Sequence, residues 1–384
     1  MKCIQCLTDS DLKDRIANQG RCKYCHHPFS FEPTTMEAKL RFTDGFFAKA
    51  LADISANGTL YFTRRQLLYL LEKRLVRKAR FGPFGCVTFF LLVGGTIFIA
   101  GAMGWLFALA YFFLGGIGLS YVFQRLDRRP LQPQKTTKGI YITDAMLDIW
   151  LKRWEQFNGS QARLLPPPSA PASLAPAATT TAADDDVTAY SFDRVLVCES
   201  DEIAQLLIAN NIHFEHNCAV LSISGYPQAI FATTMAMLRR NPDLQVIALH
   251  DCSPSGVALI YKLRTSRDWS LDSTQVIFDL GMLPRQIAAA RGQAYIQVSA
   301  RFAQKAQILP QDVRQPLTAT ELQWLEAGYF VDLESFTPQK LMQIVSQGIA
   351  RMQNLGEDVD DNLILVGDVG GGDGTFIYAS DNFG

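Results

Sequence analysis

Short apolar runs alternate with segments of helical periodicity across residues 191–355. The apolar runs lie in DRVLVCES, CAVLSISGY, LQVIALHDCS and STQVIFDLG, and the helical segments between them include DEIAQLLIANN, IFATTMAMLRRN and GVALIYKLRT. Apolar strands without polar alternation are buried on both faces, which is typical of a parallel sheet covered by helices. The pattern therefore predicts an α/β domain around a parallel sheet in this part of the chain.

A helical pattern further upstream places an aromatic residue apart from its apolar stripe. We expect a helix that begins after Thr63 as N-cap and runs to about Lys78. One face carries the apolar stripe Leu67, Leu68, Leu71 and Leu75. Tyr69 falls on the opposite face, between Arg65 and Lys73, and we expect it to lie outside that core. A surface aromatic and a residue that packs against the uncharged segment 84–123 are the two structural alternatives for Tyr69.

Residues 84–123 contain no charged side chain at all. They divide into two spans of about twenty residues, each long enough to cross a hydrocarbon core of about 30 Å. The basic flanks are Lys73, Arg74, Arg77, Lys78 and Arg80 before the segment, and Arg125, Arg128 and Arg129 after it. We therefore predict a two-helix transmembrane hairpin in the lipid bilayer, with both soluble regions in the cytoplasm. A buried hairpin in a soluble protein is the alternative.

The segments on either side of the predicted sheet domain differ in composition. Residues 134–159 combine a short strand with an amphipathic helix that carries Trp150 and Trp154. Residues 160–190 are rich in Pro, Ala and Thr and predict a disordered linker. The tail, 356–384, contains GDVGGGDG, which lacks the Gly-Lys-Ser/Thr of a P-loop and is more typical of a flexible loop.

Net charge and cysteine content limit the kinds of nucleic-acid and metal site that the chain can contain. The net charge of −1 means that any nucleic-acid surface must be a local patch. The pairs CIQC and CKYC supply Cys3, Cys6, Cys22 and Cys25 at the spacing Cys-x2-Cys-x15-Cys-x2-Cys. Four thiolates at this spacing predict a structural zinc ribbon at 1–34. Four reduced, buried thiols are the alternative.

Two acids follow predicted strands of the sheet. Glu199 ends the first strand and Asp251 ends the third, and chemistry in parallel sheets collects at these carboxyl ends. Ser253 stands two residues after Asp251, where a second acid would complete a metal pair. A magnesium site formed by Glu199 and Asp251, with a water or the Ser253 hydroxyl in the missing place, is one interpretation. A turn at Asp251 and a helix cap at Glu199-Ser200-Asp201 are the alternatives.

The order of these landmarks resembles the A subunit of topoisomerase VI and its relatives that make meiotic double-strand breaks. The similar blocks are VLVCESDEIAQLL, SGYPQAIFATTMAMLRR, VIALHDCSPSGVALI, VIFDLGMLP and YFVDLESFTPQKL, with TRRQLLY upstream. The resemblance covers about 55–80 and 192–350 and implies a Toprim domain at 191–355. It also implies an α+β winged-helix domain, here split between 35–82 and 134–159.

The family's chemistry gives a role to each candidate residue. Tyr69, four residues after Arg65, corresponds to the tyrosine that attacks a DNA phosphodiester, and Glu199 and Asp251 correspond to acids that hold Mg²⁺. In the family the tyrosine of one protomer faces the acids of the other, which implies a homodimer, and strand passage needs a separate ATPase subunit.

Three features depart from the family pattern: Ser253 in place of an acid, the uncharged segment, and the cysteine pairs where the ATPase partner normally binds. The sequence thus predicts a membrane-tethered, DNA-binding protein with a degraded metal site and a residual or conditional capacity for Mg²⁺-dependent strand cleavage. The alternative is a non-catalytic membrane scaffold that keeps the fold to dock a protein or a nucleotide.

Overall fold

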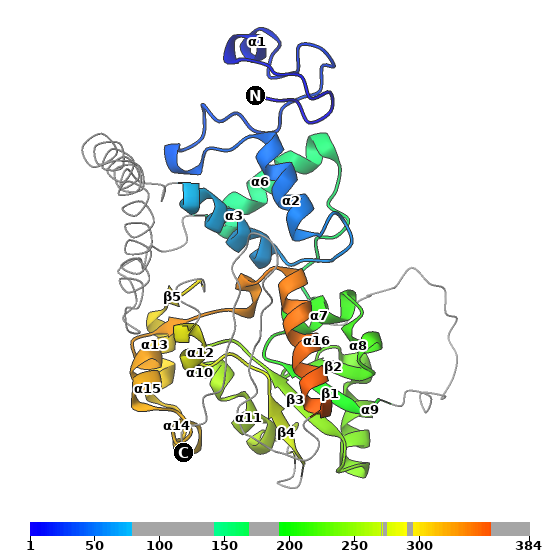
Figure 1. Ribbon diagram of the computed structural model, residues 1–384, viewed down its shortest axis with the longest axis vertical. Coiled ribbons are helices and arrows are strands. Elements are labelled where there is room, and N and C mark those ends of the chain that lie inside the picture. The colour runs from blue at the N-terminus through cyan, green and yellow to red at the C-terminus, as the bar shows by residue number, and fades with distance from the viewer. Residues whose placement is uncertain (79–141, 169–191, 270, 272–274, 290–294, 355–384) are drawn as a thin grey trace, which may run out of the picture.

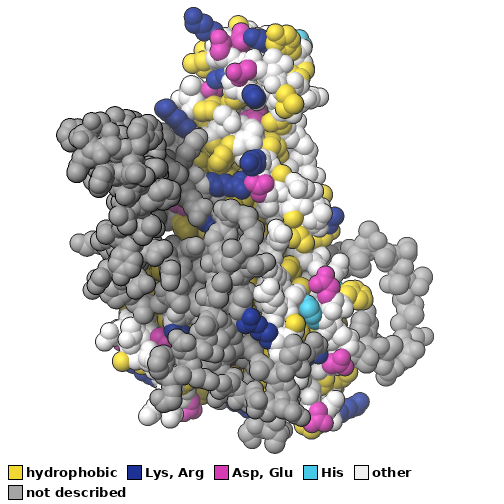
Figure 2. Space-filling model, in the orientation of Figure 1, with side chains coloured by type: hydrophobic (Ala, Val, Ile, Leu, Met, Phe, Trp, Pro, Cys, Tyr) yellow, Lys and Arg dark blue, Asp and Glu magenta, His cyan; other side chains and the backbone are white. Residues whose placement is uncertain are grey.

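The computed structural model describes residues 1–78, 142–168, 192–269, 271, 275–289 and 295–354 (Figure 1). The predicted transmembrane hairpin at 84–123 and the tail at 356–384 lie outside these residues. Within the described ranges, no helix has both the length and the apolar character that a bilayer crossing needs. On the face drawn in Figure 2, the described Lys and Arg side chains are interspersed with Asp and Glu, in keeping with the small net charge.

A four-stranded parallel sheet in the order β2-β1-β3-β4 forms the centre of the C-terminal domain. Its strands are β1 (Arg194–Cys198), β2 (Cys218–Ser222), β3 (Gln245–Leu249) and β4 (Ile277–Asp279). Cys198 at the end of β1 is in register with Ser222 of β2 and Leu249 of β3, so these strands end flush. The predicted α/β domain with a parallel sheet is confirmed.

Helices bury both faces of this sheet. Leu196 and Leu249 point into a core shared with α7 and α16, whereas Val195 and Val246 point into a second core shared with α9 and α11. Because each strand is covered on both sides, its sequence reads as a continuous apolar run. The helices of the domain are α7 (Asp201–Ala209), α8 (Ile212–Glu215), α9 (Gln228–Arg240), α10 (Pro254–Val257), α11 (Leu259–Thr265), α12 (Pro284–Ala289), α13 (Ala300–Gln307), α14 (Gln311–Arg314), α15 (Ala319–Glu326) and α16 (Pro338–Asn354). The short pair β5 (Gln297–Val298) and β6 (Tyr329–Phe330) and the 3-10 turn η3 (Leu333–Ser335) complete it.

Three helices form a separate core between the sheet domain and the N-terminal module (Figure 1). They are α2 (Asp44–Ile54), α3 (Arg64–Lys78) and α6 (Asp144–Asn158), preceded by α1 (Leu12–Ala17) and the turn η1 (Ala38–Leu40). The predicted stripe Leu67, Leu68, Leu71 and Leu75 is buried in this core. The helix starts as predicted, because Thr63 and Gln66 exchange hydrogen bonds at 3.0 and 3.1 Å in a capping box. Among the described residues of this unit, β structure is limited to the bridge between Phe62 and Leu164, so the winged-helix wing stays a prediction.

Two expectations about individual segments were wrong. Tyr69 lies on the face opposite the leucine stripe, but its side chain is only 2% exposed, because that face of α3 packs against the sheet domain. The start of the predicted linker is ordered: Leu164 pairs with Phe62, and Leu165 is buried in the core of the sheet domain. The rest of the linker, 169–191, lies outside the described residues.

Candidate functional site

The strand-end acids lie side by side at the carboxyl edge of the sheet. Glu199 directly follows β1, and Asp251 follows β3 after one intervening residue, His250. Since β1 and β3 are neighbours in flush register, the two loops meet, and the Asp251 backbone N–H donates to Glu199 Oε2 at 3.1 Å. The structure therefore brings together the two acids that the sequence singled out.

Ser253 is part of the same turn and caps the helix that follows it. Its buried hydroxyl accepts from the Gly256 N–H at 3.0 Å and lies 3.4 Å from Glu199 Oε1. A Cβ on Gly256 would stand 2.1 Å from the Asp251 carbonyl oxygen and 2.8 Å from Glu199 Oε2. Glycine is therefore required at the point where α10 passes the acids, which explains the Asp-x-x-Pro-x-Gly pattern of this turn.

A second pair of acids, which the sequence pattern did not single out, joins this edge. Cys252 and Val331 exchange two backbone hydrogen bonds of 3.0 Å, which dock the segment after β6 onto the turn after β3. The Leu333 N–H then donates to Asp251 Oδ1 at 2.7 Å, and Asp332 and Glu334 lie on either side of it. The sequence feature that could have identified them is the Asp-x-Glu pair after the short apolar run YFV. It lies in the block YFVDLESFTPQKL, which was quoted above only for its resemblance to the family.

The helical unit presents Tyr69 to this second pair. The Tyr69 hydroxyl donates to Asp332 Oδ2 and accepts a hydrogen bond of 2.6 Å from Gln297 Nε2. Arg65 lies one turn earlier on α3, with its Nη2 atom 3.9 Å from Asp332 Oδ2. The resemblance implied a tyrosine facing the acids of a partner protomer, whereas here Tyr69 contacts an acid of its own chain.

Thr63 makes a second link between α3 and the acids. Its hydroxyl donates to Glu334 Oε1 at 2.7 Å while it caps the helix through the Gln66 N–H. The start of α3 is therefore fixed against the acidic edge by Thr63 and Tyr69 together.

Burial and mutual repulsion control the protonation of these groups. Burial raises the pKa of Asp251, and the Glu199 charge raises it further. Burial likewise raises the pKa of Glu199, and it raises the pKa of Glu334 to about 7. Burial and the Asp332 carboxylate both raise the pKa of Tyr69, so the phenol is neutral in this arrangement.

A buried positive charge lies beneath the acids. His250 Nε2 is 3.0 Å from Asp279 Oδ1, and its Nδ1 is 2.8 Å from the Asp251 carbonyl oxygen. Both partners are acceptors, so both ring nitrogens must donate and the imidazole is protonated. Burial acts to lower the pKa of His250, but Asp279 raises it overall. A Cβ on Gly281 would approach the His250 ring to 2.1 Å, so this glycine makes room for the imidazolium.

The carboxylates suit a magnesium ion. Mg²⁺ is usually bound by one or two carboxylates together with waters and substrate phosphates. Glu199 and Asp251 are half-buried neighbours whose pKa values are raised, a situation that a bound cation relieves. Asp332 and Glu334 can extend the set, although in the described residues only the N-terminal cysteines bring three or more ligand atoms within 4.8 Å of one another.

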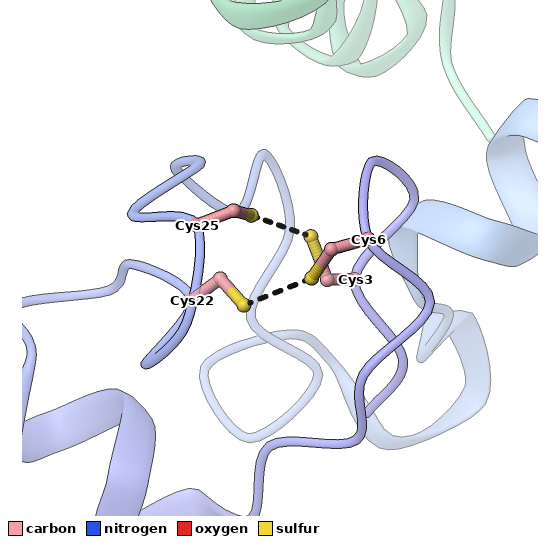
Figure 3. A group of neighbouring side chains, drawn as sticks. All are labelled: Cys3, Cys6, Cys22 and Cys25. Carbon is pink, nitrogen blue, oxygen red and sulfur yellow. Dashed lines mark hydrogen bonds between the residues drawn. The ribbon is translucent and has the colours of Figure 1, made fainter.

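That cysteine cluster could hold a zinc ion (Figure 3). The Sγ atoms of Cys3 and Cys25 are 3.6 Å apart, and those of Cys6 and Cys22 are 3.5 Å apart. A tetrahedral zinc site with Zn–S bonds of about 2.3 Å places its sulfurs about 3.8 Å apart. The spacing of the thiols in the structure therefore fits the ion that the sequence predicts.

The two cysteine pairs sit in turns of the same construction. The Cys3 N–H donates to the Thr8 carbonyl, and the Cys22 N–H donates to the His27 carbonyl, each at 2.9 Å. Leu7 and His26, each directly after the second cysteine of its pair, both adopt a left-handed φ, of 60° and 56°. Repetition of one backbone turn aims four sulfurs at one point, although strands of a zinc ribbon are represented here only by isolated bridges.

We expect the full chain, purified in reducing, chelator-free buffer, to carry about one zinc ion. Cys22→Ser should lose the metal and lower the unfolding temperature of the N-terminal module, because one ligand of the tetrahedron is gone. His26→Asn is the matched control, since it lies in the turn beside the ligands but adds no ligand to the set. Metal analysis that finds the wild-type chain free of zinc would exclude the structural zinc site.

The raised pKa of Glu334 predicts a pH dependence of stability in the absence of divalent cations. The folded state holds the Glu334 proton up to about pH 7, whereas an unfolded glutamate releases it near pH 4.3. Stability should therefore fall as pH rises through this window and level off above it, by roughly 4 kcal/mol from this group. Glu334→Gln keeps the acceptor for Thr63 and should remove this part of the slope.

The measurement is the free energy of unfolding in urea at a series of pH values. Glu155→Gln, on the exposed surface of α6, serves as the control and should follow the wild type. Parallel curves for wild type and Glu334→Gln would mean that Glu334 is not the group that titrates in this window.

Comparison with known proteins agrees with the geometry of the sheet domain. The family model for the Toprim domain of topoisomerase 6 A subunits and Spo11 matches residues 194–347. A search of curated proteins returns no match to the chain. The matched range begins with β1 and includes Glu199, Asp251, Ser253, Asp332 and Glu334. The α/β domain is thus a Toprim-like domain of the topoisomerase VI A/Spo11 type.

Proposed function

We propose that this chain binds DNA and cleaves a strand through Tyr69 in a Mg²⁺-dependent reaction. One observation carries the proposal: the tyrosine hydroxyl of α3 lies directly on Asp332, whose loop is bound to the loop of Asp251. The proposed nucleophile thus lies next to the acids, although they are far apart in the sequence. The match to the Toprim domain of the topoisomerase 6 A/Spo11 family supports DNA as the substrate.

In the proposed reaction the Tyr69 oxygen attacks a backbone phosphorus and the bond to the 3′ oxygen breaks, which leaves a 5′-phosphotyrosyl ester. Asp332 is placed to accept the phenolic proton, and Gln297 is placed to stabilise the negative charge that develops on the phenol oxygen. Glu334, with a pKa of about 7, can return a proton to the leaving oxygen. A Mg²⁺ ion held by Glu199 and Asp251 would neutralise the phosphate and orient its oxygens.

A non-catalytic scaffold is the second candidate, and a specific observation favours it. The Tyr69 oxygen already has two partners, Asp332 and Gln297, and its side chain is 2% exposed. DNA can reach this oxygen only if the contact between α3 and the acidic edge opens. A chain in which that contact never opens would keep the fold without the chemistry.

The same contact bears on membrane topology. Tyr69 precedes the uncharged segment 84–123 and Asp332 follows it, yet the two side chains are hydrogen-bonded. Any crossing of a bilayer between them must therefore be even in number. This supports our proposal of a two-pass hairpin with both soluble regions on the cytoplasmic side, where the flanking Lys and Arg residues belong.

We further propose two partners on the basis of the family of the Toprim domain: a second copy of the chain, in a homodimer, and a separate ATPase subunit. The contact of Tyr69 with its own Asp332 is compatible with a dimer in which opening of one protomer releases its tyrosine.

Covalent trapping tests the cleavage proposal. With Mg²⁺ and a DNA duplex, detergent-solubilised wild type should form covalent protein–DNA adducts, and Ser253→Asp should form more, because a further carboxylate beside Glu199 strengthens cation binding. Tyr69→Phe should abolish the adducts, because it removes the attacking oxygen and keeps the ring. Tyr61→Phe, on the loop before α3, is the matched control.

Adducts that survive Tyr69→Phe would show that another residue is the nucleophile. If wild type and Ser253→Asp bind DNA but neither forms adducts, the scaffold function is correct.

A second test concerns topology. Proteolysis of oriented membrane vesicles should cut residues 1–78 and 192–354 from the same side, since these regions are hydrogen-bonded to each other. Cleavage from opposite faces would contradict both the two-pass hairpin and a site shared by Tyr69 and the acids.

A further inference from the structure

Two lysines from different helices converge on one residue beside the acids. Lys262 of α11 donates from Nζ to the Ser255 carbonyl oxygen at 3.3 Å. Lys305 of α13 donates from Nζ to the Ser255 hydroxyl at 3.0 Å. Ser255 stands in α10, immediately before Gly256, where a Cβ would touch the Glu199 carboxylate. The two ammonium groups therefore adjoin the acidic edge.

Neither ammonium group forms an ion pair in the described part of the chain. Neither Lys262 nor Lys305 has a described carboxylate within 4.0 Å, and both use a neutral oxygen of Ser255 instead. Lys262 is half-buried, and burial lowers its pKa, although the nearby Glu199 charge acts to raise it and the Lys305 charge lowers it further. The two cations repel each other, and an anion bound between them would reduce that repulsion.

We propose that Lys262, Lys305 and the Ser255 hydroxyl form a phosphate-binding subsite that holds a DNA backbone phosphate next to the one at the acids. The inference rests on the proposed function and adds a binding role for residues outside the acid set. Two ammonium groups and a hydroxyl are donors that suit a phosphodiester. A second fixed phosphate would define the direction in which the strand crosses the acidic edge, because the lysines lie on the α10 side and Tyr69 lies on the η3 side.

The test is DNA binding by the full, detergent-solubilised chain at a series of salt concentrations. The double variant Lys262→Gln with Lys305→Gln should reduce the slope of log K against log salt by about 1.8, since each phosphate contact contributes about 0.9. Lys262→Arg with Lys305→Arg should keep most of the slope, because both charges remain.

The charge-matched control is Arg239→Gln with Arg240→Gln. These exposed residues end α9, just before β3 begins, and so lie at the opposite edge of the sheet. Their removal changes the net charge equally but should leave the slope within experimental error of the wild type.

The possible outcomes distinguish a failure of the phosphate subsite from a failure of the proposed function. If wild type binds DNA, and the Lys262→Gln/Lys305→Gln and Arg239→Gln/Arg240→Gln variants both lose the same amount of slope, the subsite is wrong while DNA binding stands. If wild type binds no DNA, titration with inorganic phosphate decides: binding that is lost in the Lys→Gln variant supports the phosphate subsite with a free phosphate as ligand. Absence of phosphate binding as well would overturn the subsite.

Discussion

The paired backbone hydrogen bonds between Cys252 and Val331 are the constraint on which the rest of the site depends. They dock the segment after β6 onto the turn after β3, and so bring Asp332 and Glu334 to an edge that already holds Glu199 and Asp251. The helical unit then binds to the docked segment through Thr63 and Tyr69, and to the end of α7 through Tyr61, whose backbone exchanges hydrogen bonds with the Asn210 side chain. One two-residue bridge thus couples the acids to the helix that precedes the uncharged segment.

The four carboxylates stay together because each has its own donor. Glu199 accepts from the Asp251 N–H, Asp251 from the Leu333 N–H, Asp332 from Tyr69, and Glu334 from Thr63. A hydrogen bond to an ionised member of the set contributes about 1.5–3 kcal/mol, which offsets part of the repulsion and the cost of burial. Two of the four donors belong to α3 and its N-cap, so separation of the helical unit from the sheet domain would leave Glu334 without its Thr63 donor and Asp332 with Gln297 alone, whose Nε2 lies 3.2 Å from Asp332 Oδ2.

Local periodicity predicted the sheet, the leucine stripe of α3 and the positions of Glu199 and Asp251, because these depend on neighbouring residues and on the rule that parallel strands end at one edge. The burial of Tyr69 could not be predicted in this way. Its partner Asp332 is 263 positions away, and a stripe of leucines reveals one buried face of a helix but not a second face covered by another domain. Asp332 and Glu334 were missed for the same reason: the Cys252–Val331 bridge that gives them a role joins segments with no sequence signal in common.

In the proposed reaction, the contact that places Tyr69 for attack also prevents attack. Its hydrogen is shared with Asp332, its oxygen accepts from Gln297, and the adjacent negative charge opposes ionisation of the phenol. To expose the oxygen, the chain must break both hydrogen bonds, at a cost of a few kcal/mol. DNA can supply that energy if its phosphates, held by cations at the acidic edge and by lysines beside it, interact more strongly with the open site than with the closed one. In that case the Tyr69–Asp332 contact makes nucleophile release conditional on substrate, which suits an activity that would be harmful if it occurred without control.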